Sequence, residues 1–170
     1  MVLDTETTGL GETDEIIQLA VVDLDSNVLF YENVKPTKRK RISKDAIAVH
    51  GLTMETLAGC RTFFELAIPL RRAIGRKTII TYNAAFDMRL YGQSYQLAGG
   101  FLPRGTWECA MLEYAKFVGE WNDYHGGYKW QKLPSAEHSA LADCLATVEL
   151  IYSMARSVKL KHWYEFWVSR

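Results

Sequence analysis

The sequence predicts an α/β domain that is built on a five-stranded mixed sheet. Short apolar runs rich in β-branched residues alternate along the chain with segments whose apolar residues recur at helical spacing. The first strand-like runs follow one another directly, which favours antiparallel pairing, whereas helices separate the later runs, which favours parallel pairing. No repeat or Pro/Gly/Ser-rich linker interrupts the 170 residues, so we expect a single domain over residues 1–170.

The first three expected strands lie close together near the start of the chain. Residues 1–6 form a short buried strand, and residues 15–25 are apolar and β-branched. Residues 27–36 form the third strand, and the pair Ser26–Asn27 is suited to a tight hairpin turn between the second and third strands. These three runs therefore predict the antiparallel part of the sheet.

Short helical pieces are expected in residues 42–59, where Ser43 can cap the first piece and Thr53 begins the second. A longer helix is expected over residues 61–75, whose apolar residues follow helical spacing. Pro69 lies inside this helix and could kink it or mark a new start. This region thus predicts the first helical layer.

The rest of the chain is expected to supply the parallel part of the sheet. A strand, a helix, a short strand followed by a helix, and a long helix are expected over residues 77–83, 84–100, 106–119 and 138–157. Residues 120–134 form an irregular aromatic loop that could stack bases or simply pack. The aromatic tail 157–170 favours a helix packed on the sheet over a peptide that docks on a partner.

Composition gives no sign of a membrane or secreted protein. No apolar stretch is long enough to cross a bilayer and no signal peptide opens the chain, so we expect a cytoplasmic protein without a membrane partner. The three cysteines are widely spaced, which predicts reduced thiols rather than disulfides or a zinc site. The formal net charge is zero, but residues 35–41 and 71–77 are locally basic. Such runs are usually solvated faces, although the first could contact a phosphate backbone.

Acidic residues gather where the predicted strands and helices meet. Asp4 and Glu6 are two residues apart in a strand, so their side chains point to the same face. Asp87 follows the fourth strand, and Asp143 lies one turn into the last long helix with His138 before it. Neighbouring carboxylates repel one another unless a cation lies between them, and oxygen ligands suit Mg²⁺. Four such charges would balance two divalent cations.

Three segments of the sequence resemble the motifs of the DEDD exonuclease superfamily, namely LDTETTGL, YNAAFD and HSALAD. The spacing of His138 and Asp143 resembles that of the DEDDh branch, which includes exonuclease X, ribonuclease T and the proofreading epsilon subunit of DNA polymerase III. The segment AVHGLT at residues 48–53 is similar to a further part of that branch. The resemblance spans residues 2–156 and implies a ribonuclease-H-like fold with helices on both faces of the sheet.

The resemblance also implies 3′-to-5′ exonuclease chemistry with two Mg²⁺ or Mn²⁺ ions. Asp4 would be the ligand shared by both ions, Glu6 and Asp143 would complete the coordination of one ion, and Asp87 that of the other. His138 would act as the general base that takes the proton from the attacking water.

The same resemblance implies a binding place for the terminal nucleotide of a single strand with a free 3′ end. Gly9 would let the backbone come close, and Leu10 could wedge against the terminal base. The full expected set of substrate-binding residues is Thr7, Gly9, Leu10, Val49, His50, Asn83 and Phe86.

Three functions remain open from the sequence. DNA is favoured as the substrate because ALADCLAT and WECAM look most like exonuclease X, but an exoribonuclease that trims RNA is an alternative. The third possibility is a polymerase-associated proofreading subunit, or a non-catalytic or weakly catalytic subunit that binds a polymerase or another partner through its C-terminal aromatic residues. The sequence does not decide between a polymerase partner, a homodimer and a protein that acts alone.

Overall fold

A computed structural model describes residues 1–38, 41–100, 105–134 and 137–168 of the chain, with side chains as far as Val158. At its centre is a five-stranded sheet with the strand order β3-β2-β1-β4-β5. The strands are β1 (Val2–Thr7), β2 (Ile16–Val22), β3 (Val28–Asn33), β4 (Ile79–Thr81) and β5 (Trp107–Cys109). Neighbours among β1, β2 and β3 are antiparallel, whereas β1, β4 and β5 run parallel. The mixed sheet expected from the sequence is therefore confirmed.

The central strand β1 is paired unequally on its two sides. It runs antiparallel to β2 from Val2, opposite Val22, to Thr7, opposite Ile16. Its pairing with β4 is limited to Val2, opposite Ile80. The second half of β1 therefore extends past the end of β4, and Asp4 and Glu6 line a cleft at this open end of the sheet.

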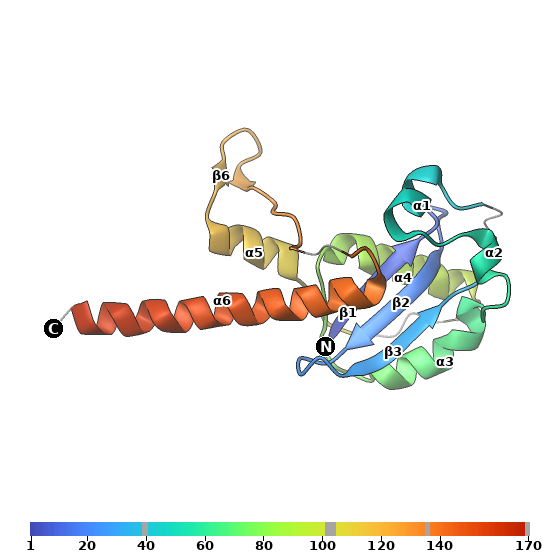
Figure 1. Cartoon of the computed structure of the whole chain (residues 1–170), viewed down its shortest axis with the longest axis horizontal. Coiled ribbons are helices and arrows are strands. Elements are labelled where there is room, and N and C mark those ends of the chain that lie inside the picture. The colour runs from blue at the N-terminus through green and yellow to red at the C-terminus, as the bar shows by residue number, and fades with distance from the viewer. Residues whose placement is uncertain (39–40, 101–104, 135–136, 169–170) are drawn as a thin grey trace.

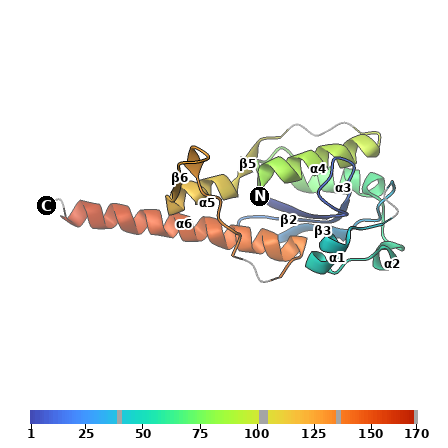
Figure 2. The same ribbon diagram turned by 90° about the horizontal axis from the view of Figure 1, so that it is seen from above.

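Helices cover both faces of the sheet, as Figure 2 shows. On one face, α3 (Phe63–Ile74) and α4 (Ala84–Leu97) pack on a cluster that includes Leu3 and Leu19 of the sheet. On the other face, α6 (Ala140–Val168) packs through Ala140, Cys144 and Val148 on Val2, Ala20 and Val22. Because side chains alternate along a strand, Asp4 and Glu6 share the face of Val2 and point towards α6.

Two short helices follow the antiparallel part of the sheet. The hydroxyl of Ser43 accepts a hydrogen bond from the Ala46 amide and caps α1 (Lys44–His50). Thr53 and Thr56 form a reciprocal capping box at the start of α2 (Met54–Leu57). Both caps agree with the sequence-based expectation. Pro69 does not interrupt α3, which continues from Phe63 to Ile74.

The aromatic segment expected to be irregular contains a short hairpin. Helix α5 (Ala110–Val118) leads into β6 (Trp121–Asn122) and β7 (Gly127–Tyr128), which pair antiparallel. The Asn122 side chain accepts hydrogen bonds from the amides of Tyr124 and His125, and Gly126 has a φ of 64°. An asparagine turn followed by a left-handed glycine closes such a hairpin. The expectation of an irregular loop was wrong because this turn chemistry was not recognised.

The last helix is longer than its apolar pattern indicates. One continuous α6 runs to Val168, and both ribbon views show its C-terminal part leaving the sheet (Figures 1 and 2). The tail is therefore helical, but the expectation that it packs on the sheet was wrong. The side chains of residues 159–170 lie outside the described part of the structure. Among the described residues, no helix combines the length and hydrophobicity needed to cross a bilayer.

Candidate active site

Three carboxylates meet at the open end of β1. Asp4 and Glu6 come from β1 and Asp143 from the first turns of α6, and one ligand oxygen of each lies within 4.8 Å of the others. Asp143 reaches this place because the start of α6 is held against the sheet. The side chain of Gln18 on β2 accepts a hydrogen bond from the Ala140 amide at 2.9 Å. Gln18 was not among the residues expected from the sequence.

Asp87 approaches the same place from α4, on the opposite side of the sheet. It is 3% exposed, and its carboxylate accepts a hydrogen bond from the Thr5 hydroxyl at 2.9 Å. Thr5 lies between Asp4 and Glu6 and points to the other face of β1. Strand β1 therefore presents Asp4 and Glu6 on one face, and its Thr5 holds Asp87 on the other face.

All four acids and His138 line one cleft of about 660 Å³. His138 lies in the loop before α6 and is exposed to solvent. The structure thus brings together all five residues that the sequence predicted as catalytic. Tyr82, Met111 and the segment 131–133 complete the wall on the side of α5.

The close approach of the acids changes their proton affinities. Burial and the charges of Asp87, Asp143 and Glu6 raise the pKa of Asp4 well above its ordinary value. Burial, with the charges of Asp143 and Asp87, raises the pKa of Glu6 to about 7. Burial also raises the pKa of Asp87 to about 7, although the Thr5 hydrogen bond opposes this shift. Such mutual repulsion is what a bound divalent cation would relieve, and the hard oxygen donors fit Mg²⁺ or Mn²⁺.

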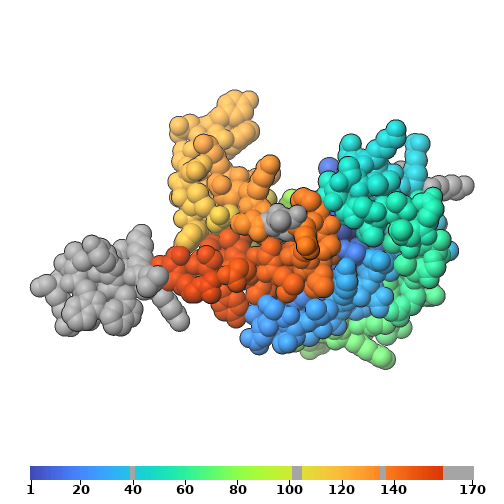
Figure 3. All heavy atoms as spheres, viewed as in Figure 1, coloured from blue at the N-terminus to red at the C-terminus, as the bar shows by residue number. Residues whose placement is uncertain are grey.

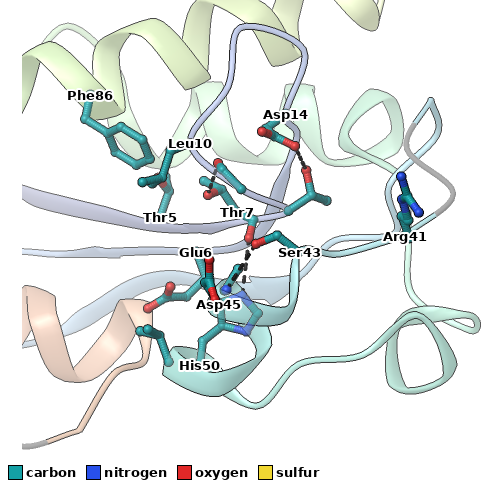
Figure 4. A pocket seen from close by; sticks show the side chains of 14 residues that line it. Thr5, Glu6, Thr7, Leu10, Asp14, Arg41, Ser43, Asp45, His50 and Phe86 are labelled. Carbon is teal, nitrogen blue, oxygen red and sulfur yellow. Dashed lines mark hydrogen bonds between the residues drawn. The ribbon is translucent and has the colours of Figure 1, made fainter.

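A second hollow of about 590 Å³ adjoins the cleft. The two cavities share Thr5, Glu6, Val49 and Phe86 as lining residues, so they lie side by side. Figure 4 shows Leu10 and Phe86, from different elements, lining this hollow. Six of the seven expected substrate-binding residues line it, namely Thr7, Gly9, Leu10, Val49, His50 and Phe86. The seventh, Asn83, lies in the cleft with the acids.

His50 is held by hydrogen bonds to the protein backbone. Its Nδ1 accepts from the Leu52 amide at 3.0 Å, so its Nε2 carries the proton and donates to the Thr7 carbonyl at 3.2 Å. Partial burial lowers the pKa of His50 below its ordinary value. A neutral His50 therefore links the end of α1 to the end of β1 and supports one side of the hollow.

The loop that follows β1 is fixed by residues the sequence did not reveal. Asp14 is buried and accepts hydrogen bonds from the Thr8 hydroxyl at 2.7 Å and the Gly11 amide at 2.7 Å. On α4, Gln93 donates to the carbonyls of Glu12 and Asp14. Nothing in the sequence singles out Asp14 or Gln93 among the other polar residues of the loop and of α4.

Comparison with known proteins assigns the chain to a family. Residues 1–151 match the family model described as "Exonuclease". The chain belongs to the exonuclease family. An uncharacterized exonuclease of Escherichia phage 186, CP81, is 34% identical to this exonuclease over 172 residues, covering 91% of this chain and 87% of the phage protein. The epsilon subunit of DNA polymerase III from Escherichia coli K12 is 28% identical over 123 residues, which cover 66% of this chain and 50% of that subunit.

Solved structures show the same fold as this exonuclease. Exonuclease X in complex with 5′-overhanging duplex DNA has a TM-score of 0.65 and 26% identity, covering 92% of this chain and 90% of that one. The nuclease domain of 3′hExo, a DEDDh family member bound to rAMP, has a TM-score of 0.72 at 15% identity with the same coverage. The ribonuclease-H-like fold expected from the three motifs is confirmed, and so is the relationship to exonucleases.

Membership of the family defines the general chemistry of this exonuclease. It is a nuclease, a hydrolase of phosphodiester bonds that belongs to a family using divalent metals. The cluster of Asp4, Glu6 and Asp143 is where the structure provides ligands for such metals.

Proposed function

We propose that this chain, as one domain, is a 3′-to-5′ exonuclease that removes nucleoside 5′-monophosphates from the 3′ end of single-stranded DNA. The observation that carries the proposal is the union of two cavities around Glu6. One contains the four acids and His138. The other is a hollow of about 590 Å³, lined in part by the apolar Leu10, Val49 and Phe86, which we propose as the place of the terminal nucleotide. A strand whose last nucleotide fills the hollow would have its terminal phosphodiester beside the acids.

Asp4, Glu6, Asp87 and Asp143 are the residues that would hold two Mg²⁺ or Mn²⁺ ions. The fit rests on the short distances within the acid cluster and on the raised pKa values of Asp4, Glu6 and Asp87. When bound, two divalent cations supply positive charge beside the attacking and leaving oxygens of the phosphodiester.

His138 is proposed to take the proton from the attacking water. Its ring lines the cleft with the acids, yet it is exposed and can exchange that proton with solvent. Imidazole is the side chain that most often acts as a general base in enzymes, which suits this role. No other histidine lines the cleft in the part of the chain that the structure describes.

The hollow is proposed to hold the terminal nucleotide through apolar contacts. Leu10 is 80% exposed at the tip of its loop, and Phe86 lies under the guanidinium of Arg89, 5.4 Å from the ring centre. Exposed apolar side chains bind a base through its face, which every base has, and this favours binding without sequence preference. We prefer DNA because the chain is similar to exonuclease X, which has been solved with DNA.

A degradation assay with end-labelled oligonucleotides tests the polarity. With Mg²⁺, a 3′-labelled single strand should release labelled mononucleotide at once, whereas a 5′-labelled strand should shorten gradually as a ladder. The opposite pattern would overturn the proposed polarity. Matched RNA and DNA oligomers in the same assay test the sugar preference. If RNA were degraded faster than DNA, the preferred substrate would be RNA.

A substitution of His138 separates the proposed base from the metal ligands. His138→Gln should reduce turnover strongly, by about 10²-fold or more, while Mg²⁺ still raises the melting temperature as in the unaltered protein. If the variant lost this thermal shift, His138 would be a metal ligand rather than the base.

A further inference from the structure

The hairpin between α5 and α6 exposes a group of aromatic side chains beside the cleft. Trp121, Tyr124 and Tyr128 belong to the hairpin, and Trp130 follows it; all four are exposed. Figure 1 shows the hairpin standing off the rest of the molecule above α5. Large exposed aromatics are costly in water, so this group indicates a binding surface.

Ring packing and backbone hydrogen bonds give the hairpin a defined conformation. Trp121 and Tyr128 pack edge to face, with ring centroids 5.3 Å apart. The Lys129 amide donates to the Glu120 carbonyl at 2.8 Å, and the Gly126 amide donates to the Asn122 carbonyl at 2.9 Å. A hairpin closed in this way holds its exposed rings in place, so less conformational entropy is lost when they bind a ligand.

The chain passes directly from this aromatic group into the cleft. Trp130 is 70% exposed, and its neighbours Gln131, Lys132 and Leu133 line the cleft with the four acids. The Tyr82 hydroxyl donates a hydrogen bond to the Gln131 carbonyl at 2.7 Å and so ties this segment to the end of β4. Consecutive Cα atoms are about 3.8 Å apart, so Trp130 stands at the rim of the cleft.

The aromatic group lies on the side of the acids away from the nucleotide hollow. The hollow is lined by α1 and the loop after β1, whereas the cleft is also lined by Met111 of α5 and the segment 131–133. Figure 3 shows the surface hollowed between the α5–hairpin region, in yellow and orange, and the α1–α2 region, in cyan. A strand that ends in the nucleotide hollow must therefore continue past the segment 131–133.

We infer that Trp130, supported by the hairpin behind it, stacks on bases of the single strand immediately 5′ of the phosphodiester that is cut. This inference rests on the proposed function and names the part of the substrate that the cleft itself does not hold. Base stacking fits better than charge, because residues 120–132 contain two acids, Glu120 and Asp123, against Lys129 and Lys132. Lys129 also lies 3.7 Å from Glu120 in an ion pair. A nearly neutral aromatic surface binds bases without sequence preference.

The test compares two substrates of different length. An oligothymidylate of about 12 nucleotides can reach the hairpin, whereas the p-nitrophenyl ester of thymidine 5′-monophosphate can occupy only the hollow and the acids. Trp130→Ala should raise the KM for the oligomer by about fivefold or more and leave hydrolysis of the ester unchanged. Trp130→Phe should restore the oligomer KM, because a phenyl ring still stacks. Phe64→Ala is the matched control, since Phe64 is also 70% exposed but lies on α3.

Equal KM values for Trp130→Ala and the unaltered protein on the oligomer would overturn the inference and leave the aromatic surface for a protein partner. An equal loss on both substrates would also overturn it, because the segment would then act on the cleft itself. Fluorescence anisotropy of the labelled oligomer in an Asp4→Asn background measures binding without turnover. If the unaltered protein cleaved neither substrate, the proposed function would fail, and this binding measurement would still decide whether Trp130 contacts the strand.

Discussion

The guanidinium of Arg89 donates a hydrogen bond to the carbonyl of Leu10 at 3.1 Å, across 79 positions of the sequence. The same guanidinium donates to the Gly11 carbonyl at 2.9 Å and lies over the ring of Phe86. Leu10 is therefore an exposed apolar side chain on a backbone that is held from α4. This contact orients both proposed walls of the nucleotide hollow with one cation.

Removal of this contact should weaken substrate binding more than turnover. Arg89→Met keeps the apolar stem but loses both hydrogen bonds to the loop, so we expect the KM for single-stranded DNA to rise by about tenfold, since a hydrogen bond to a charged group contributes about 1.5–3 kcal/mol. The kcat should change little, because Arg89 does not line the acid cleft. Arg156→Met, which removes an exposed cation on α6, is the control. An unchanged KM in Arg89→Met would show that the loop keeps its place without this residue.

A methyl group at Gly9 should disturb the same loop. An added Cβ would lie 2.8 Å from Oδ2 of Asp14, whose carboxylate is held by Thr8 and Gly11 and cannot easily move. Gly9→Ala should reduce the free energy of unfolding by about 1–3 kcal/mol and raise the KM for DNA. Gly59→Ala is the matched control, because nothing lies within 4 Å of a Cβ there. Thermal unfolding and steady-state kinetics measure the two effects, and equal behaviour of both variants would argue against a rigid loop.

Neutralising Asp4 should have opposite effects on activity and on stability. Asp4→Asn should abolish nuclease activity, because it removes the acid that feels the charges of all three others, Asp87, Asp143 and Glu6. The metal-free variant should nevertheless melt at a higher temperature than the unaltered protein at pH 8, since the repulsion of Asp4 by Asp87, Asp143 and Glu6 is removed. Calorimetry in EDTA provides the measurement. A lower melting temperature would mean that the acids stabilise the fold rather than strain it.

The acid cluster should make the metal-free protein less stable as the pH rises. The pKa of Glu6 is raised from 4.5 to about 7 and that of Asp87 from 3.8 to about 7, so between these values the folded protein binds more protons than the unfolded chain. The contribution of these two groups to the free energy of unfolding is therefore largest below pH 4, falls as the pH rises, and levels off above pH 7. Melting temperatures in EDTA from pH 5 to pH 8 should follow this slope.

Mg²⁺ or Mn²⁺ at millimolar concentration should remove or reverse that slope, because a cation binds the ionised carboxylates. Glu6→Gln should flatten the slope in EDTA, since it removes one of the two titrating groups. A melting temperature in EDTA that rises with pH would contradict the assigned direction of both pKa shifts.

Local patterns in the sequence were sufficient for the fold class and for the acids. The alternation of side chains in β1 places the half-buried Asp4 and Glu6 on one face, and the helical turn after Ser139 places Asp143 one turn into α6. These relationships depend only on the geometry of one strand or one helix. The hairpin at residues 121–128 also depends on local turn chemistry, but its strands are only two residues each, too short for a periodic signal.

The contacts that shape the site were not readable in this way. Gln18 meets the Ala140 amide across 122 positions, and Gln93 meets the Glu12 carbonyl across 81. Nothing in the sequence marks such pairs, because each partner is an ordinary polar residue whose role depends on which element packs beside it. The expected helix over residues 138–157 was also too short, because α6 continues without a break through the tail to Val168.

The sequence by itself determined which groups could do the chemistry: four acids and a histidine on elements whose order implied a common edge of the sheet. Only the tertiary structure decided what positions and surrounds these groups. Arg89 holds the loop after β1, Gln18 holds the start of α6, and the aromatic hairpin lies at the rim of the cleft. The physical reason is the distance along the chain over which each kind of interaction acts. Backbone periodicity acts over a few residues and can be read along the chain, whereas a hydrogen bond between distant segments exists only after packing has brought them together.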